Sequence, residues 1–258
     1  MGWKGSGRAP VAWVAALFMA LVPVGARAEV GFSYLLTPDG VVMLVVPEGA
    51  EGPSPVVLVL PDALGPDRRS QPYLELLNAH GVATVELLPT GDDGRGTAPD
   101  PARNDPAGIV AALSADPRVD ASRLGVLAFG AGGAIALGDP ALAGVPAALL
   151  YPGCAGLPPA GRPVLLLHGG MDPTDPPGAC ARWTAAGGRL ARRHEYAGAA
   201  YGWDYFDGPW ADGFALLPSP AGSGRRVWAR ADPATTADAA HRVADFLTAE
   251  LDTAGAPR

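Results

Sequence analysis

The sequence predicts an α/β fold: a doubly wound, mostly parallel sheet that begins with an N-terminal antiparallel hairpin. Several apolar runs, of which residues 56–60 are the first, show no alternation of apolar and polar residues, as is typical of strands buried on both faces of a parallel sheet. A helix-like stretch follows each run, which favours a doubly wound arrangement. Before them, residues 31–46 read as two strand-like segments joined through Asp39 and Gly40, a dipeptide that tolerates the positive φ of a tight turn.

The predicted elements follow in chain order. Hairpin strands are expected at 32–36 and 41–46, and parallel strands at 56–60, 82–88, 124–129 and 163–168, with a weaker one at 146–151. Helices are expected at 70–80, 106–115, 131–138, 177–187 and 236–251. Because ligands in such sheets bind beyond the carboxyl ends of the strands, the loops at those ends are where a site is expected.

Composition excludes several classes of protein. The 258 residues include 35 Gly and 28 Pro, but these lie between apolar runs and form no repeat, which excludes collagen and solenoids. The net charge is −7 and the basic residues are scattered, so nucleic acid is not an expected partner. Lys4 is the only lysine, which excludes Schiff-base chemistry and a phosphate-loop lysine.

Residues 1–28 are predicted to be a cleavable export signal, and residues 29–258 a single domain. Two basic residues precede an apolar run at 11–24, and Ala-Arg-Ala at 26–28 gives the small residues that a signal peptidase reads. A transmembrane anchor is the competing interpretation, but the run is shorter than the roughly 20 residues needed to span a bilayer. We therefore expect a periplasmic or secreted protein with no stable membrane anchor after cleavage.

The two cysteines, Cys154 and Cys180, both lie in the part predicted to be exported, where a disulfide can persist. We predict that they are bridged. Two separate buried thiols are the alternative, because spacing alone does not fix their geometry. No metal site is expected, since no second Cys or His lies at zinc-ligand spacing from either cysteine.

A strand turns into a helix over closely spaced glycines at residues 124–134. This is the frame of a nucleophile elbow, in which a small residue, any residue, the nucleophile, any residue and glycine follow one another. The five positions here are Ala128, Phe129, Gly130, Ala131 and Gly132. Gly130 therefore stands in the nucleophile's place without a heteroatom. The glycines lack the G-x-G-x-x-G spacing of a dinucleotide site, so no cofactor is predicted.

Four blocks of sequence carry a family resemblance. They are Pro-Asp-Ala-Leu-Gly at 61–65, Phe-Gly-Ala-Gly-Gly at 129–133, His-Gly-Gly-Met-Asp at 168–172 with Pro176, and Tyr-Ala-Gly-Ala-Ala-Tyr-Gly-Trp-Asp at 196–204. In their order and spacing the sequence resembles the dienelactone hydrolases, a branch of the α/β-hydrolase fold, over nearly the whole of the predicted domain. The resemblance implies that fold and a site built from a triad and an oxyanion hole.

The resemblance also implies roles for particular residues. Asp172 matches the carboxylate of the triad, whereas Tyr201 stands where the family carries its catalytic histidine. Asp62 matches an acidic residue beside the nucleophile, and the backbone N–H groups of Ala63 and Ala131 match the oxyanion hole. Nucleophile and base are thus both replaced.

The replacement of the base matters because a general base must have a pKa near neutral to take a proton and return it. Histidine has an unperturbed pKa of about 6.5 and tyrosine one of about 10, so Tyr201 is not a simple substitute. The remaining histidines and serines read as surface, turn or capping residues outside the matching loop; the histidines are His80, His168, His194 and His241.

Two hypotheses follow. The first is an exported protein with a degraded triad that binds a small molecule or a protein of unknown kind, in a pocket where Asp62 and Asp172 favour a neutral or cationic guest. The second is an active hydrolase of esters or lactones that uses a water activated by Asp172 or Asp62.

Two further segments have open interpretations. Residues 89–105 form either a lid that carries Arg95 or Arg103 over the pocket or a solvated loop. The aromatic residues Trp203, Tyr205, Phe206 and Trp210 either line a ligand site or pack beneath a long loop.

Overall fold

The structure is a computed structural model that describes residues 1–2, 30–38, 40–49, 52–88, 105–206, 213–221 and 224–255. Residues 3–28 of the predicted export signal, the loop at 89–104 with both of its arginines, Asp39 and Trp210 therefore lie outside the described residues. None of the helices in the described ranges has the length and apolar character that crossing a bilayer requires.

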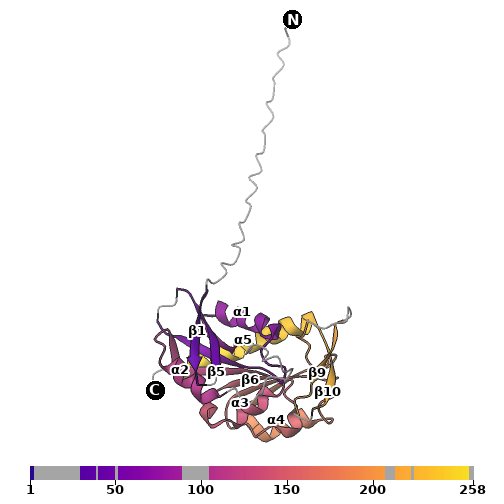
Figure 1. Ribbon diagram of the computed structural model, residues 1–258. Coiled ribbons are helices and arrows are strands. Elements are labelled where there is room, and N and C mark those ends of the chain that lie inside the picture. The colour runs from indigo at the N-terminus through magenta and orange to yellow at the C-terminus, as the bar shows by residue number, and fades with distance from the viewer. Residues whose placement is uncertain are drawn as a thin grey trace.

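An eight-stranded sheet forms the centre of the fold, in the order β1-β2-β4-β3-β5-β6-β7-β8 (Figure 1). Strands β3 to β8 run parallel, and the antiparallel hairpin β1–β2 extends the sheet through β4. The strands are β1 Val30–Thr37, β2 Gly40–Pro47, β3 Ser54–Leu60, β4 Ala83–Leu87, β5 Val119–Phe129, β6 Ala147–Leu150, β7 Val164–Gly169 and β8 Ala191–Tyr196. The predicted mostly parallel sheet with an N-terminal hairpin is confirmed.

Helices cover both faces of this sheet. Residues of α1 and α5 pack on one face and residues of α2, α3 and α4 on the other, each with the alternate side chains of the central strands. The helices are α1 Gln71–Ala79, α2 Pro106–Ser114, α3 Gly132–Gly138, α4 Ala179–Gly187 and α5 Pro233–Gly255, and short 3-10 turns are η1 Arg68–Ser70, η3 Pro140–Leu142, η4 Cys154–Gly156 and η5 Gly188–Leu190. Burial of β3, β6 and β7 on both faces explains why these strands lack alternation.

A second, two-stranded antiparallel sheet consists of β9 Phe214–Pro218 and β10 Arg226–Arg230. Its inward residues Ala215, Leu217 and Ala229 belong to the core on the α1–α5 side.

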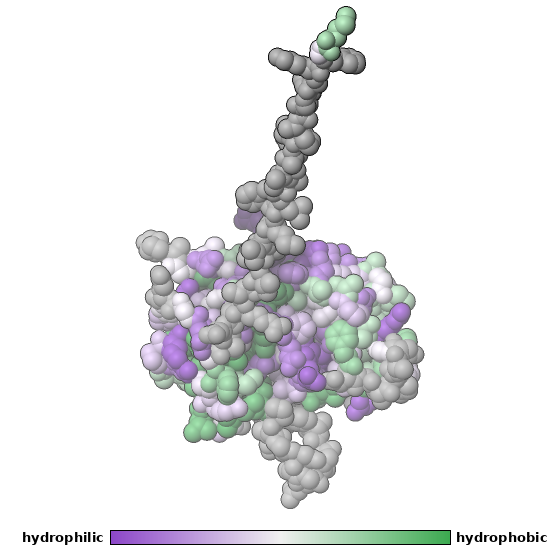
Figure 2. All heavy atoms as spheres, turned by 90° about the horizontal axis from the view of Figure 1, so that it is seen from above, coloured by the Kyte–Doolittle hydropathy of each residue, from purple (hydrophilic) through white to green (hydrophobic). Residues whose placement is uncertain are grey.

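The surface seen from above in Figure 2 mixes hydrophilic and hydrophobic residues.

Three strands, β8, β9 and β10, differ from the elements that the sequence predicts. Strand β8 is Ala-Arg-Arg-His-Glu-Tyr. It lacks an apolar pattern because a strand at the edge of a sheet tolerates charged side chains. Strands β9 and β10 have five residues each and alternate between a core face and a solvent face. Strand β5 and helix α5 are also longer than predicted, and the β6 strand, expected to be weak, is fully buried.

Candidate functional site

The elbow lies at the carboxyl end of β5, near the middle of the sheet. Gly130 follows the strand with a φ of +47°, a left-handed conformation that glycine adopts at little cost. Its N–H donates to Leu150 O at 3.0 Å. A Cβ added at Gly132 would lie 2.6 Å from Leu60 O, so glycine is also required where α3 packs against the end of β3.

Tyr201 fills the space in front of Gly130. A Cβ added at Gly130 would lie 2.6 Å from Tyr201 Oη and 2.9 Å from Asp62 Cβ, both closer than real Cβ contacts. Tyr201 is fully buried, and its hydroxyl has no hydrogen-bond partner in the part of the chain that the structure describes. The tyrosine hydroxyl therefore occupies the region into which a nucleophile's side chain would project.

Burial raises the pKa of Tyr201 well above its usual value, with the charge of Asp62 next in size, while Arg69 acts in the opposite direction. The charge of Asp172 also raises it. The phenol is therefore protonated at neutral pH, and it can donate a hydrogen bond but cannot act as a base.

Asp172 lies in the loop that follows β7. Its Oδ1 accepts hydrogen bonds from Thr174 N at 2.8 Å and Thr174 Oγ1 at 2.6 Å. Its Oδ2 is buried and has no partner among the described residues. Burial raises the pKa of Asp172 to about 6, against the lowering effect of the Thr174 hydrogen bonds.

Tight packing fixes the Asp172 loop against the segment that leads to Tyr201. Met171 N donates to Ala199 O at 3.0 Å, and a Cβ added at Gly169 would lie 2.3 Å from that same oxygen. The two glycines of the His-Gly-Gly-Met-Asp block thus permit close contact between the loops.

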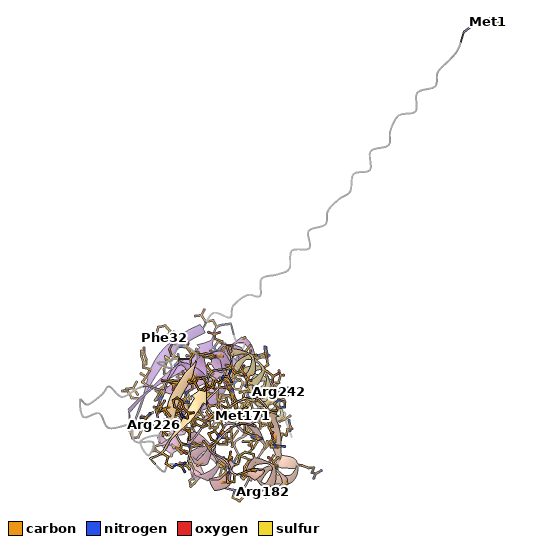
Figure 3. The ribbon with its side chains drawn as sticks, turned by 90° about the vertical axis from the view of Figure 1, so that its right-hand side faces the viewer. Met1, Phe32, Met171, Arg182, Arg226 and Arg242 are labelled. Carbon is orange, nitrogen blue, oxygen red and sulfur yellow. A yellow bond between two sulfur atoms is a disulfide. The ribbon has the colours of Figure 1, made fainter. Side chains whose placement is uncertain are left out.

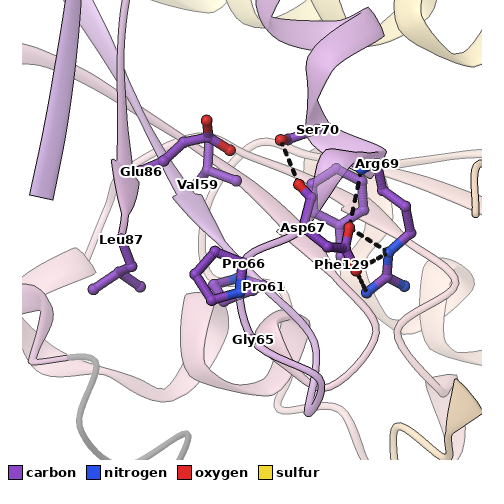
Figure 4. Close-up of a pocket in the computed structure, with 10 residues that line it drawn as sticks. All are labelled: Val59, Pro61, Gly65, Pro66, Asp67, Arg69, Ser70, Glu86, Leu87 and Phe129. Atoms are coloured by element: carbon purple, nitrogen blue, oxygen red, sulfur yellow. Dashed lines mark hydrogen bonds and ion pairs between the residues drawn. The ribbon is translucent and has the colours of Figure 1, made fainter. Parts of the chain in front are cut away.

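Asp62 is held in a buried ion pair that sequence reasoning missed. Its Oδ2 lies 2.7 Å from Arg69 Nη1, and its Oδ1 accepts from Leu64 N at 2.7 Å. Arg69 is also bound to Asp67, as the dashed lines in Figure 4 show, and lies over the Tyr205 ring. Asp62 is therefore not a free carboxylate, which removes the main reason for expecting a cationic guest.

A third buried carboxylate, Asp204, follows Tyr201 by three residues in the chain. It accepts hydrogen bonds from Tyr73 Oη at 2.9 Å and Tyr151 Oη at 2.5 Å. Burial raises the pKa of Asp204 to about 6. Tyr151 has a φ of +41°, unusual for a bulky residue, and its ring lies 4.9 Å from those of Tyr201 and Trp203. The ring of Tyr151 therefore packs against the Tyr201 ring, and its hydroxyl is bound to Asp204.

The predicted oxyanion groups belong to the elbow and to the loop after β3. Ala131 precedes α3, and Ala63 is in the loop after β3; both are partly exposed. Neither of their N–H groups has a hydrogen-bond partner within the described residues. Two backbone donors therefore remain available for an acceptor atom.

No protein-family model matches the sequence, and no curated protein is significantly similar to it. Among solved structures, a dienelactone hydrolase-like promiscuous phosphotriesterase from metagenomic libraries aligns with 85% of this chain and 98% of its own, at 20% identity and a TM-score of 0.58.

Two further solved structures are similar to this chain. A putative dienelactone hydrolase from Klebsiella pneumoniae shares 19% identity over 85% of this chain and 98% of its own, with a TM-score of 0.56. A dienelactone hydrolase from Anabaena variabilis shares 16% identity over 86% and 98%, with a TM-score of 0.57. The chain therefore has the α/β-hydrolase fold of these structures.

In this fold the cysteines form a disulfide, as predicted. Cys154 in η4 and Cys180 in α4 are bonded at 2.02 Å. The bridge joins the loop after β6 to the helix after the Asp172 loop, where Asp175 Oδ1 accepts from Ala155 N at 3.2 Å. The only potential metal-ligand cluster within the described residues is these two cysteines with Asp175, but sulfurs bonded to each other are not thiolate ligands.

The four histidines lie at positions other than the one that Tyr201 occupies. Arg193 donates to His168 Nε2 at 2.9 Å, and burial lowers the pKa of His168. His80 is bound through Nδ1 to Leu76 O, and His194 packs edge-on against Tyr196. His241 is exposed on α5.

Two hollows lie beside the site without including Gly130 or Tyr201. The one in Figure 4, of about 10 Å³, has room for a single water and lies between Asp67, Glu86 and Phe129. The other, of about 340 Å³, is lined by Arg68, Arg69, Gln71, Pro72, Glu75, Asp204 and Phe206. Of the predicted aromatic cluster, Trp203 is buried and Phe206 lines this second hollow.

The raised pKa values of Asp172 and Asp204 predict an unusual pH dependence of stability. Each carboxyl keeps its proton up to about pH 6 in the folded chain, whereas the unfolded chain releases it near pH 4. This stabilisation is therefore present below about pH 4 and is lost as the pH rises through about 6, by at most about 3 kcal/mol for each group. Urea unfolding near pH 4 and near pH 7 measures it.

Asp172→Asn isolates one of the two groups. We expect the free energy of unfolding of this variant to fall less between the two pH values than that of the unmodified protein, because Asn does not titrate. Other acidic residues contribute equally to both proteins and cancel in the difference. Identical pH slopes would contradict the assignment of a raised pKa to Asp172.

Proposed function

We propose that the chain is an exported, dienelactone-hydrolase-like protein that binds a small molecule at its former reaction centre without covalent catalysis. The observation that carries the proposal is the distance of 2.6 Å between Tyr201 Oη and a Cβ built at Gly130. A covalent mechanism needs a nucleophile with a base beside it. Gly130 offers no attacking atom, and the hydroxyl of Tyr201 fills the adjoining space.

The chemistry of the site favours a neutral guest. Asp62 is paired with Arg69, and Asp172 Oδ2 and Tyr201 Oη are buried without partners among the described residues. Buried polar atoms without partners cost free energy, so a ligand that supplies a donor to Asp172 and an acceptor to Tyr201 would recover it. A hydroxy-carbonyl compound has both kinds of atom, whereas an ester or lactone supplies the acceptor and would reach Asp172 through a water.

The second candidate is a hydrolase in which Asp172 activates a water. Its pKa of about 6 is close to the range that suits a general base, and the N–H groups of Ala63 and Ala131 are available to an oxyanion. An oxyanion hole alone can accelerate a reaction by about 10³–10⁴ over water, so this candidate predicts slow turnover.

Purified protein and Asp172→Asn, each mixed with small aryl esters, separate the two candidates. Binding without catalysis predicts no turnover above buffer in either protein, together with a rise in the unfolding temperature when a neutral lactone or ester binds. Saturable turnover that Asp172→Asn abolishes would replace the first candidate with the second.

A further inference from the structure

The hairpin β9–β10 has one face toward the core and one toward solvent. Residues two apart on a strand share a face, so Arg226, Trp228 and Arg230 of β10 project together. They lie opposite Pro218, Leu216 and Phe214 of β9 in the hairpin register. The inward residues between them, Ala215, Leu217 and Ala229, are buried in the core.

This outer face combines exposed apolar side chains with positive charge. Trp228 is 53% exposed and Leu216 37% exposed, and the rings of Phe214 and Trp228 meet edge to face at 6.1 Å. Arg226 and Arg230 are exposed at the two ends of the row, and Arg225 is exposed beside them. None of the six outward residues of the two strands is acidic.

Within the described ranges, neither Arg226 nor Arg230 forms an ion pair with a carboxylate. Arg226 donates to Leu216 O at 2.8 Å, and Arg230 lies over the Phe214 ring at 5.7 Å. Asp232, which follows β10, accepts from Thr235 N and Ala234 N at the start of α5; these hydrogen bonds lower its pKa, and the charge of Arg230 also contributes. Arg226 is thus held against β9 and Arg230 against the Phe214 ring, and only Arg230 is near the charge of Asp232 among the described residues.

We propose that the outer face of β9–β10 binds reversibly to a membrane surface that contains anionic phospholipid. Tryptophan with flanking arginines is the combination that favours the interface between lipid headgroups and acyl chains. The net charge of −7 would repel such a surface, so the local positive charge selects this face for contact. A sugar site is a poorer fit, since no amide or carboxylate lies on the face to bind hydroxyl groups.

The position of the hairpin connects this surface to the candidate site. Tyr201 forms a β-bridge with Ala229, and Arg230 N donates to Tyr201 O at 3.2 Å. A Cβ added at Gly202 would lie 2.7 Å from Leu217. The hairpin therefore packs directly on the Tyr201 segment, and membrane contact would place the former reaction centre close to molecules dissolved in the lipid.

Co-sedimentation with vesicles tests the proposal. We expect the purified protein to bind vesicles of phosphatidylcholine with phosphatidylglycerol, but not vesicles of phosphatidylcholine alone. The double variant Arg226→Gln/Arg230→Gln should bind about 30-fold more weakly, because each arginine near an anionic surface contributes on the order of 1 kcal/mol. Trp228→Ala should weaken binding without changing its dependence on salt, since it removes apolar contact and no charge.

The matched control is Arg182→Gln/Arg189→Gln, which removes the same charge from exposed positions on and beside α4; Arg182 lies apart from Arg226 in Figure 3. This control should bind as the unmodified protein does, and all variants should unfold at similar temperatures. Failure of the unmodified protein to bind the anionic vesicles would overturn the proposal, even if it bound an acidic polysaccharide instead. Equal weakening in the control and the β10 variant would also overturn it.

Discussion

Replacing Gly130 with alanine should lower the free energy of unfolding by about 2–5 kcal/mol. Overpacking a tight site costs about 1–3 kcal/mol, and a non-glycine residue in the left-handed region costs roughly 1–2 kcal/mol more. The added Cβ would lie within 3 Å of both Tyr201 Oη and Asp62 Cβ. Gly144→Ala is the control, because Gly144 has a φ of +82° and open space around its Cβ position, so it measures the backbone cost alone.

Tyr201→Phe should recover part of the loss. It deletes the oxygen that collides with the new methyl group, and that oxygen has no hydrogen-bond partner among the described residues. The single Tyr201→Phe change should therefore cost little or stabilise the chain. In a double-mutant cycle measured by urea unfolding we expect a coupling of about 1–3 kcal/mol between positions 130 and 201. A Gly130→Ala cost equal to that of Gly144→Ala, or an absence of coupling, would show that Tyr201 does not block the site.

The second large effect is the return of nucleophile chemistry. Gly130→Ser together with Tyr201→His removes the colliding hydroxyl and supplies an attacking oxygen and a base with a pKa near neutral. We expect this double variant to become covalently labelled by a fluorophosphonate, provided that Asp62 gives way slightly, because its Cβ lies 2.9 Å from the new Cβ position.

Each single variant should remain unlabelled, because members of a triad act as a unit. Gly130→Ala/Tyr201→His is the matched control for the fold and should also stay unlabelled. Adding Asp172→Asn should reduce labelling by disturbing the orientation of the histidine. A folded Gly130→Ser/Tyr201→His variant that does not react would mean that position 201 does not reach the elbow as a base must.

Much of the fold follows from the sequence because its central strands are short apolar runs between turn residues. Strand β7, for example, is a fully buried Val-Leu-Leu-Leu-His-Gly that reads as a parallel strand without further information. Strand β8 does not, because its arginines and glutamate reflect its place at the edge of the sheet. Pairing of Cys154 with Cys180 was predictable from their number and the expected export, although not from spacing.

The candidate site was predictable as a set of positions but not as a network. The order of the four sequence blocks predicted that Asp62, Gly130, Asp172 and Tyr201 belong to one site. The pairing of Asp62 with Arg69, in contrast, depends on how the η1 turn folds back. Tyr73 and Tyr151 are 131 and 53 residues away from Asp204 in the chain. No local sequence pattern therefore predicts their hydrogen bonds to it. The collision between position 130 and Tyr201 Oη is likewise a property of three-dimensional packing.

Intact-mass spectrometry of the unmodified protein after treatment with a fluorophosphonate tests the central claim most directly. If the reaction centre has no attacking heteroatom and its space is filled by a protonated tyrosine, the mass will not change. A stoichiometric adduct, mapped by peptide analysis to a residue beside Gly130 or Asp172, would contradict the account.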